Sequence, residues 1–214
     1  MNDSDTTGRR GFVLVVSAPS GAGKSTLARH LRERIPEVTV SVSTTTRPPR
    51  PGEKDGVHYH FVDQETFRAR VEGGAFLEWA EVFGNHYGTS RDAVEPVLAA
   101  GNCVLLDIDW QGARQVREAM PEEDVVTVFI APPSQESLYD RLTGRAQDST
   151  EVIAARMRKA AAEMSHWQEY DYVIINDQLE PAQSELVAVV SAERLRRHRI
   201  QEQLDAILGT FGNV

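Results

Sequence analysis

Short apolar runs recur along the chain, and segments with helical spacing of apolar positions separate most of them. The runs expected to form buried strands span 12–16, 37–42, 104–108, 125–130 and 172–175. The helices expected between or after them span 27–34, 91–100, 110–120, 135–142, 151–167 and 181–208. Strands that alternate with helices favour a mainly parallel sheet with helices on both faces. The pattern therefore predicts an α/β fold.

Residues 43–90 break this alternation. The segment 43–53 contains three prolines together with hydroxyl and arginine side chains, and proline removes backbone donors, so a regular helix is excluded there. A short strand is expected at 57–61, a helix capped by Asp63 runs to about Glu72, 75–83 is mixed, and a second short strand surrounds 86–88. We interpret 43–90 as a small β-rich insertion between two parts of one core, 12–42 and 91–208. Residues 1–11 and 209–214 are expected to be tails.

Composition narrows the class of protein. The 214 residues include 23 basic and 32 acidic side chains, giving a net charge of −9, which does not favour nucleic acid or a membrane surface as a partner. The one cysteine, Cys103, allows no intrachain disulfide and lies in an apolar run where a buried small side chain is expected. No apolar stretch has the length of a membrane span or a signal-peptide core. We expect a cytoplasmic protein.

The clearest motif follows the first strand. A glycine-rich turn between a strand and a helix is typical of a phosphate-binding loop, whose backbone N–H groups converge on phosphate oxygens. Lys24 is expected to reach the outer phosphates, and the Ser25 hydroxyl to coordinate Mg2+. Ala18 stands where the strict pattern has glycine. The motif predicts bound ATP or GTP, held by the following loop residues: Ala18, Pro19, Ser20, Gly21, Ala22, Gly23, Lys24, Ser25 and Thr26.

Two arginines in the insertion suggest a second phosphate site. Arg47 and Arg50 lie three apart in a proline-rich loop and have the geometry for bidentate bonds to a terminal phosphate. Such a loop on its own is also compatible with a solvated basic surface. Tyr59 and Tyr87 add two phenol donors to the same phosphate.

Glu78 lies among apolar residues, and a carboxylate in such company requires a specific partner. A carboxylate that accepts two parallel hydrogen bonds matches the N1–H and N2–H2 edge of guanine. Adenine offers no such pair of donors. Glu78 therefore indicates a guanine nucleotide as the second ligand.

Acidic and basic residues elsewhere complete the candidate chemistry. Asp107, at the carboxyl end of a buried strand, is placed to hold Mg2+ through water. Asp109 points to the same side, although a helix N-cap at the strand end is the alternative explanation, and it fits Asp109 better than Asp107. Arg141, Arg145 and Arg156 predict a movable basic lid within about 135–168, although Arg156 alone is also explained as an exposed helix residue.

Two further features do not indicate a binding site. His58 and His60 share one face of a strand, but no third ligand has convincing spacing, so ordinary strand side chains are favoured over a metal pair. The basic run 194–199 is interpreted as a solvated helix face and not an anion site.

Taken together, the motifs closely resemble those of the bacterial guanylate kinase family. The resemblance covers nearly all of the chain after residue 11, in matching order. The segments that carry it are APSGAGKS at 18–25, SVSTTTR at 41–47, FLEWAEVFGN at 76–85, LDIDWQG at 106–112, AEMS at 162–165 and YDYVIIND at 170–177. The family carries the same alanine as Ala18. Ala146 replaces a usual glycine, and His86 stands where tyrosine is common.

The resemblance implies a P-loop nucleoside monophosphate kinase fold and transfer of phosphate from ATP to GMP, with Mg2+ required. It implies that 43–90 binds GMP and that the lid closes over both nucleotides. Guanine contacts are expected from Ser43, Glu78 and Thr89, with Asp109 nearby, and phosphate contacts from Arg47, Arg50, Tyr59 and Tyr87. Asn176 is expected near adenine. The expected catalytic groups are Lys24, Arg47, Asp107, Arg141, Arg145 and Arg156.

Two alternatives stay open at this point. The first is a binding module of the same fold that has no catalytic activity, against which the intact phosphate loop and arginines argue. The second is a kinase for a different nucleoside monophosphate. The sequence does not distinguish a monomer from a homo-oligomer.

Overall fold

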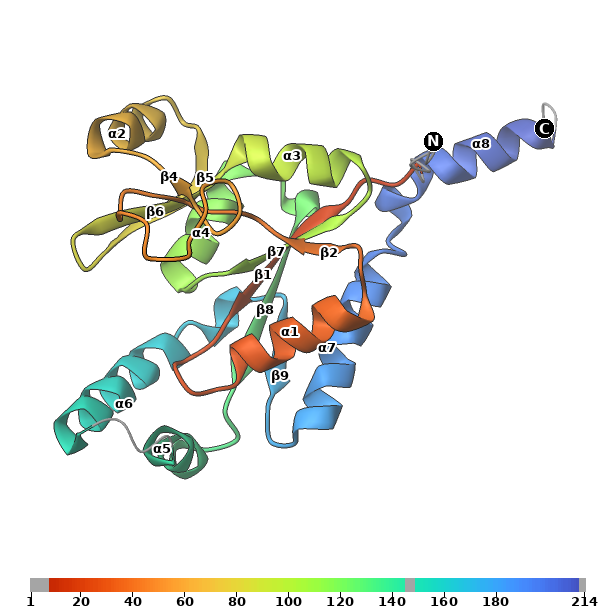
Figure 1. Ribbon diagram of the computed structural model, residues 1–214. Coiled ribbons are helices and arrows are strands. Elements are labelled where there is room, and N and C mark those ends of the chain that lie inside the picture. The colour runs from red at the N-terminus through yellow and green to blue at the C-terminus, as the bar shows by residue number, and fades with distance from the viewer. Residues whose placement is uncertain (1–7, 145–148, 212–214) are drawn as a thin grey trace.

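The computed structural model describes residues 8–144 and 149–211 and has a five-stranded parallel sheet at its centre (Figure 1). The strand order is β2-β7-β1-β8-β9. The strands are β1 Phe12–Ser17, β2 Val38–Val40, β7 Cys103–Asp107, β8 Val125–Ala131 and β9 Tyr172–Ile175. The predicted α/β class and parallel sheet are confirmed.

The central strand β1 pairs with β7 on one side and β8 on the other, and all six of its residues are buried. Its alternating side chains enter two separate cores. Phe12, Leu14 and Val16 join the core formed with α1 (Lys24–Arg34) and α7 (Leu179–Glu193). Val13 and Val15 join the core formed with α3 (Arg91–Ala99) and α4 (Trp110–Ala119). Helices therefore cover both faces, as predicted.

The strand order places a switch point at the carboxyl end of β1. After β1 the chain crosses through α1 to β2 at one edge of the sheet, whereas β8 and β9 lie on the other side. Ligands of open α/β sheets bind in the crevice at such a point. The loops after β1 and β7 meet there, and the insertion and lid project from the same side of the core (Figure 1).

The insertion has its own four-stranded sheet, with strand order β4-β3-β6-β5. Its elements are β3 Thr44–Thr45, β4 His60–Phe61, α2 Gln64–Glu72, β5 Phe76–Val82 and β6 Asn85–Ser90. Asp63 caps α2 as predicted. The mixed segment 75–83 is mostly a regular strand, and its apolar face packs on α2, where the Phe67 and Phe76 rings stack at 4.7 Å. His86 packs against Phe67 in the same cluster, with 5.3 Å between ring centroids.

The lid segment contains α5 (Gln135–Thr143) and α6 (Thr150–Met164), followed by the short helix η2 (Trp167–Glu169). The predicted helix over 151–167 ends three residues early, at Met164. Arg145 and Ala146 lie outside the described residues.

The prediction of one long helix over 181–208 is wrong. Helix α7 ends at Glu193, Arg196 adopts an extended conformation, and the chain continues through η3 (Arg197–Arg199) to α8 (Gln201–Thr210), which extends away from the core (Figure 1). Arg199 is buried, lies over the Phe12 ring at 4.5 Å and donates to the carbonyls of Gly11 and Glu123. Burial of Arg199 requires the chain to turn back toward β1, and a straight helix cannot do this.

The interpretation of the basic run as a solvated face is therefore wrong for Arg199. Its charge faces the buried carboxylate of Glu193, with 3.8 Å between Nη2 and Oε2. Glu193 also accepts from the Tyr172 hydroxyl at 2.5 Å and from Arg196. Burial lowers the pKa of Arg199, and the charge of Glu193 opposes this shift. The cluster holds the C-terminal segment to the sheet.

The end of the expected N-terminal tail is anchored in the same region. Arg10 forms a bidentate pair with the buried Asp124, and Gly11 donates to the Leu98 carbonyl at 2.8 Å. The predicted burial of Cys103 is confirmed, and desolvation raises the pKa of its thiol to about 12. Within the described part of the chain, no helix has the length and apolarity needed to cross a membrane.

We predict that Glu193→Gln lowers the free energy of unfolding by about 3 kcal/mol, because it leaves the buried Arg199 charge without its counter-charge. The matched control is Glu37→Gln, which breaks the half-exposed pair with Arg194 and is expected to cost about 1 kcal/mol or less. Urea unfolding of both variants measures the difference. Equal losses would contradict the role assigned to Glu193.

Candidate active site

The loop between β1 and α1 has the geometry of a phosphate-binding loop. Gly21 and Gly23 have φ of 96° and 99°, a region that favours glycine. A Cβ on Gly23 would lie 2.3 Å from Nδ2 of Asn176, so a side chain there is excluded for a second reason. The first turn of α1 carries no acidic side chain and no side-chain cap, so no side chain competes with a ligand for the N–H groups there.

The side chain of Asn176 supports the phosphate-binding loop through a hydrogen bond. Its side chain is buried, and Nδ2 donates to the Ala22 carbonyl at 2.7 Å. Its own backbone N–H donates to the Ala131 carbonyl, which joins the loop to the end of β8. The sequence pattern did not reveal this role, because the contact joins residues 154 apart. A contact between Asn176 and adenine stays a prediction.

The loop forms one wall of a cavity of about 360 Å3. Asp109, Lys159 and Glu163 line the cavity opposite the loop. Lys159 and Glu163 were not among the predicted site residues. They lie three and seven positions after Arg156 on α6, and this spacing places all three on one helical face. Arg156 Nη2 donates to the Ser20 hydroxyl at 2.7 Å, so this face of α6 meets the loop.

Lys24 forms an ion pair with Asp107 at the end of β7. The sequence placed both residues in the site, and the parallel pairing of β1 with β7 brings them together. The Ser25 hydroxyl and the Asp107 carboxylate are oxygen donors of the kind Mg2+ prefers. In the described residues no group of three or more His, Cys, Asp or Glu side chains is placed to hold a metal ion. Mg2+ bound through few protein ligands, phosphate oxygens and waters fits this donor set.

Asp109 is the N-cap of α4. One carboxylate oxygen accepts from the backbone N–H groups of Gln111 and Gly112, each at 3.0 Å. The N-cap explanation for Asp109 is therefore confirmed. Its carboxylate also lines the cavity, so a ligand contact is compatible with the cap.

The insertion brings together the residues predicted to hold a second phosphate. The Arg47 guanidinium lies 5.4 Å from the centre of the Tyr59 ring, and the Tyr59 and Tyr87 rings are 6.0 Å apart. Glu53, which the sequence analysis missed, accepts from Arg47 Nη2 at 2.8 and 3.0 Å and from the Arg50 N–H at 2.7 Å. These bonds lower the pKa of Glu53 to about 2 and raise that of Arg47. An acidic residue this close to two arginines was the available signal.

Glu78 is buried beside Thr89, the other predicted guanine contact. The Thr89 hydroxyl donates to Glu78 Oε1 at 2.6 Å. Burial raises the pKa of Glu78, the bonds from Thr89 oppose this shift, and the charge of Asp109 adds to it. Ser43 lies at the start of the same sheet, where its carbonyl accepts from His60 N at 2.9 Å.

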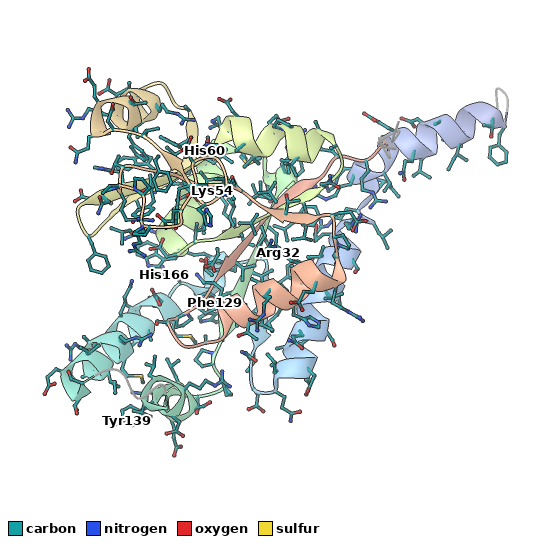
Figure 2. All side chains as sticks on the ribbon, viewed as in Figure 1. Arg32, Lys54, His60, Phe129, Tyr139 and His166 are labelled. Atoms are coloured by element: carbon teal, nitrogen blue, oxygen red, sulfur yellow. The ribbon has the colours of Figure 1, made fainter. Side chains whose placement is uncertain are left out.

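The lid connects to the core at both ends. Arg141 on α5 donates to the Asn176 carbonyl at 2.8 Å. After α6 the chain reaches His166, which is labelled in Figure 2. His166 stacks on Trp110 with 3.8 Å between ring centroids, and its Nδ1 lies 2.7 Å from Glu169 Oε1. Arg114 forms a bidentate pair with the same glutamate. Arg145 lies outside the described residues. The prediction that His58 shares a strand with His60 is wrong: strand β4 begins at His60, whereas His58 lies in a turn and its Nδ1 accepts from the Lys54 N–H.

Over most of its length the chain is similar to proteins of one family. A family model described as guanylate kinase matches residues 10–193. A guanylate kinase of Sphingopyxis alaskensis is 58% identical over 200 residues, covering 93% of this chain and 90% of the relative. One from a Chelativorans species is 54% identical over 206 residues, covering 96% and 94%. The crystal structure of guanylate kinase from Anaplasma phagocytophilum aligns with a TM-score of 0.68 at 41% identity, over 89% of this chain and 90% of that one. The chain belongs to the guanylate kinase family.

Proposed function

We propose that this protein transfers the γ-phosphate of ATP to GMP, giving ADP and GDP, in a Mg2+-dependent reaction. The observation that carries the proposal is a pair of separate phosphate sites, one with a guanine-reading carboxylate beside it. Lys24 and the loop form the first, Arg47 with Tyr59 and Tyr87 the second, and Glu78 lies in the same sheet as the second. ATP and GMP are the substrates, and the cytoplasm, a reducing compartment, suits the free thiol of Cys103.

The donor site binds the ATP phosphates. The loop N–H groups and the start of α1 surround them. Lys24, which is paired with Asp107 before ATP binds, contacts the transferred group. When bound, Mg2+ neutralises phosphate charge, and Ser25 and Asp107 are the residues that would hold it. Arg141 and Arg156 lie on the two lid helices, and together with Arg145 they neutralise the charge that develops on the γ-phosphate.

The acceptor site binds and orients GMP. Glu53 holds one side of the Arg47 guanidinium, which has five N–H donors, so the arginine is pre-positioned for the GMP phosphate. Arg50, Tyr59 and Tyr87 complete this phosphate site. The GMP phosphate is already an anionic nucleophile, so in-line attack on the γ-phosphate requires no general base. Closure of the lid excludes water, which would otherwise hydrolyse ATP.

Guanine is read by Glu78. The ionised carboxylate accepts from N1–H and N2–H2, while Thr89 donates to one of its oxygens and fixes its orientation. Ser43 and Asp109 contact the rest of the base edge. A buried carboxylate left without these donors carries a desolvation cost, so a base that lacks them is rejected.

We predict that a panel of nucleoside monophosphates with Mg2+-ATP gives rapid ADP release with GMP only. AMP, CMP and UMP lack the paired donors that Glu78 requires, so each is expected to react at least about 100-fold less efficiently. Coupled measurement of ADP gives the rates. No GMP-dependent ADP release would indicate a binding module, and equal rates with AMP would overturn the guanine assignment.

We predict that Glu78→Gln lowers kcat/KM for GMP about 100-fold, because a charge-assisted bidentate contact is lost, and leaves the KM for ATP unchanged. As pH falls through the raised pKa of Glu78, the carboxylate protonates and the wild-type KM for GMP rises, a component that Glu78→Gln lacks. The control is Glu81→Gln, an exposed glutamate on the same strand. Equal losses in both variants would contradict the role of Glu78.

We predict that Lys24→Ala lowers kcat by about 1,000-fold, because transition-state charge loses a preorganised partner. Lys54→Ala, at an exposed position of the insertion, is the matched control and is expected to keep wild-type turnover. Initial rates at saturating ATP and GMP provide the comparison. Near-normal turnover of Lys24→Ala would exclude this mechanism.

A further inference from the structure

Helix α4 closes the open edge of the sheet in the insertion. Strand β5 lies at the end of the order β4-β3-β6-β5, so one row of its backbone groups faces away from β6. Gln115 on α4 binds that row through both of its amide atoms. Its Oε1 accepts from the Trp79 N–H at 2.9 Å, and its Nε2 donates to the Trp79 carbonyl at 3.0 Å. The side-chain amide thus takes the place of a neighbouring strand.

This contact lies directly beside Glu78. Trp79 is the next residue along β5, and the pairing of β5 with β6 shifts register between Phe76 and Glu78. The ladder at this point is irregular, so hydrogen bonds from β6 alone constrain the strand less than in a regular pair. The two bonds from Gln115 supply the missing constraint on the backbone that carries the carboxylate.

The same helix also approaches the Glu78 carboxylate itself. A Cβ on Gly112, one turn before Gln115, would lie 3.4 Å from Glu78 Oε2 and 3.2 Å from Ile108 Cβ. Thr89 holds the other oxygen, Oε1, at 2.6 Å. The carboxylate therefore lies between Thr89 of β6 and the face of α4 that carries Gly112 and Gln115.

We propose that Gln115 is a positioning residue for guanine recognition. Gln115 fixes the Trp79 backbone against α4 and thereby determines the position of the Glu78 carboxylate when the base binds. The inference rests on the proposed function, in which Glu78 reads guanine. Gln115 itself does not touch the base. Its loss therefore affects the geometry of the bidentate contact and not the phosphate sites.

The test is Gln115→Met, which keeps the length of the side chain and removes both hydrogen bonds. We expect KM for GMP to rise about tenfold, with kcat and KM for ATP nearly unchanged, because a misplaced carboxylate weakens binding of the base alone. Inosine monophosphate, which has N1–H but no 2-amino group, provides the decisive comparison. The preference for GMP over this substrate is expected to fall about fivefold, since the second hydrogen bond depends most on the angle of the carboxylate.

The matched control is Gln64→Met, the same substitution at an exposed position of the insertion, which is expected to behave as wild type. Should Gln115→Met fail to fold by thermal unfolding, Gln115→Glu tests the same contact, because it keeps an acceptor for the Trp79 N–H and places a carboxylate oxygen against the Trp79 carbonyl. An unchanged KM for GMP, or equal losses with GMP and inosine monophosphate, would overturn the role of Gln115.

The failure of this inference can be told from failure of the proposed function. If the wild type shows no preference for GMP, or Glu78→Gln keeps that preference, the guanine assignment itself falls. If Glu78→Gln loses the preference and Gln115→Met keeps it, only the positioning role falls.

Discussion

The site depends on the burial of β1. Every residue of this strand is buried, its two edges are paired with β7 and β8, and its two faces enter separate cores. The strand has no freedom to shift, because a slip of one residue would move each side chain to the wrong core. The phosphate loop starts where β1 ends, and Asn176 ties the loop to the end of β8. The donor half of the site is therefore as rigid as the sheet.

The acceptor half is held differently, through α4. The first residues of this helix carry the Asp109 cap and the stack of Trp110 on His166 at the return of the lid. Further along, Gln115 binds the edge of the insertion. One helix packed on the central sheet thus contacts both the insertion and the segment that follows α6.

The sequence predicted features that depend on local pattern. Apolar runs, glycine spacing and the geometry of parallel strands predict the core strands, the phosphate loop and the proximity of Lys24 to Asp107. The sequence did not predict features that depend on contacts between residues far apart in the chain. Helical periodicity continues past Glu193, but the buried position of Arg199 over the Phe12 ring breaks the helix there. The supporting role of Asn176 was also missed, because it is a tertiary contact without a local signature. The pairing of Arg47 with Glu53 was missed although the two residues lie only six positions apart.

A chain with a net charge of −9 binds two polyanions in this scheme, and the pairing of its cations explains how. Lys24 lies against Asp107, and Arg47 against Glu53. Each carboxylate lowers the cost of holding a partly buried cation before the nucleotide arrives and restricts its side-chain rotamers. The phosphate then meets a cation that is already oriented, and less conformational entropy is lost on binding. We therefore expect local pairing, and not overall charge, to set the affinity for phosphate at both halves of the site.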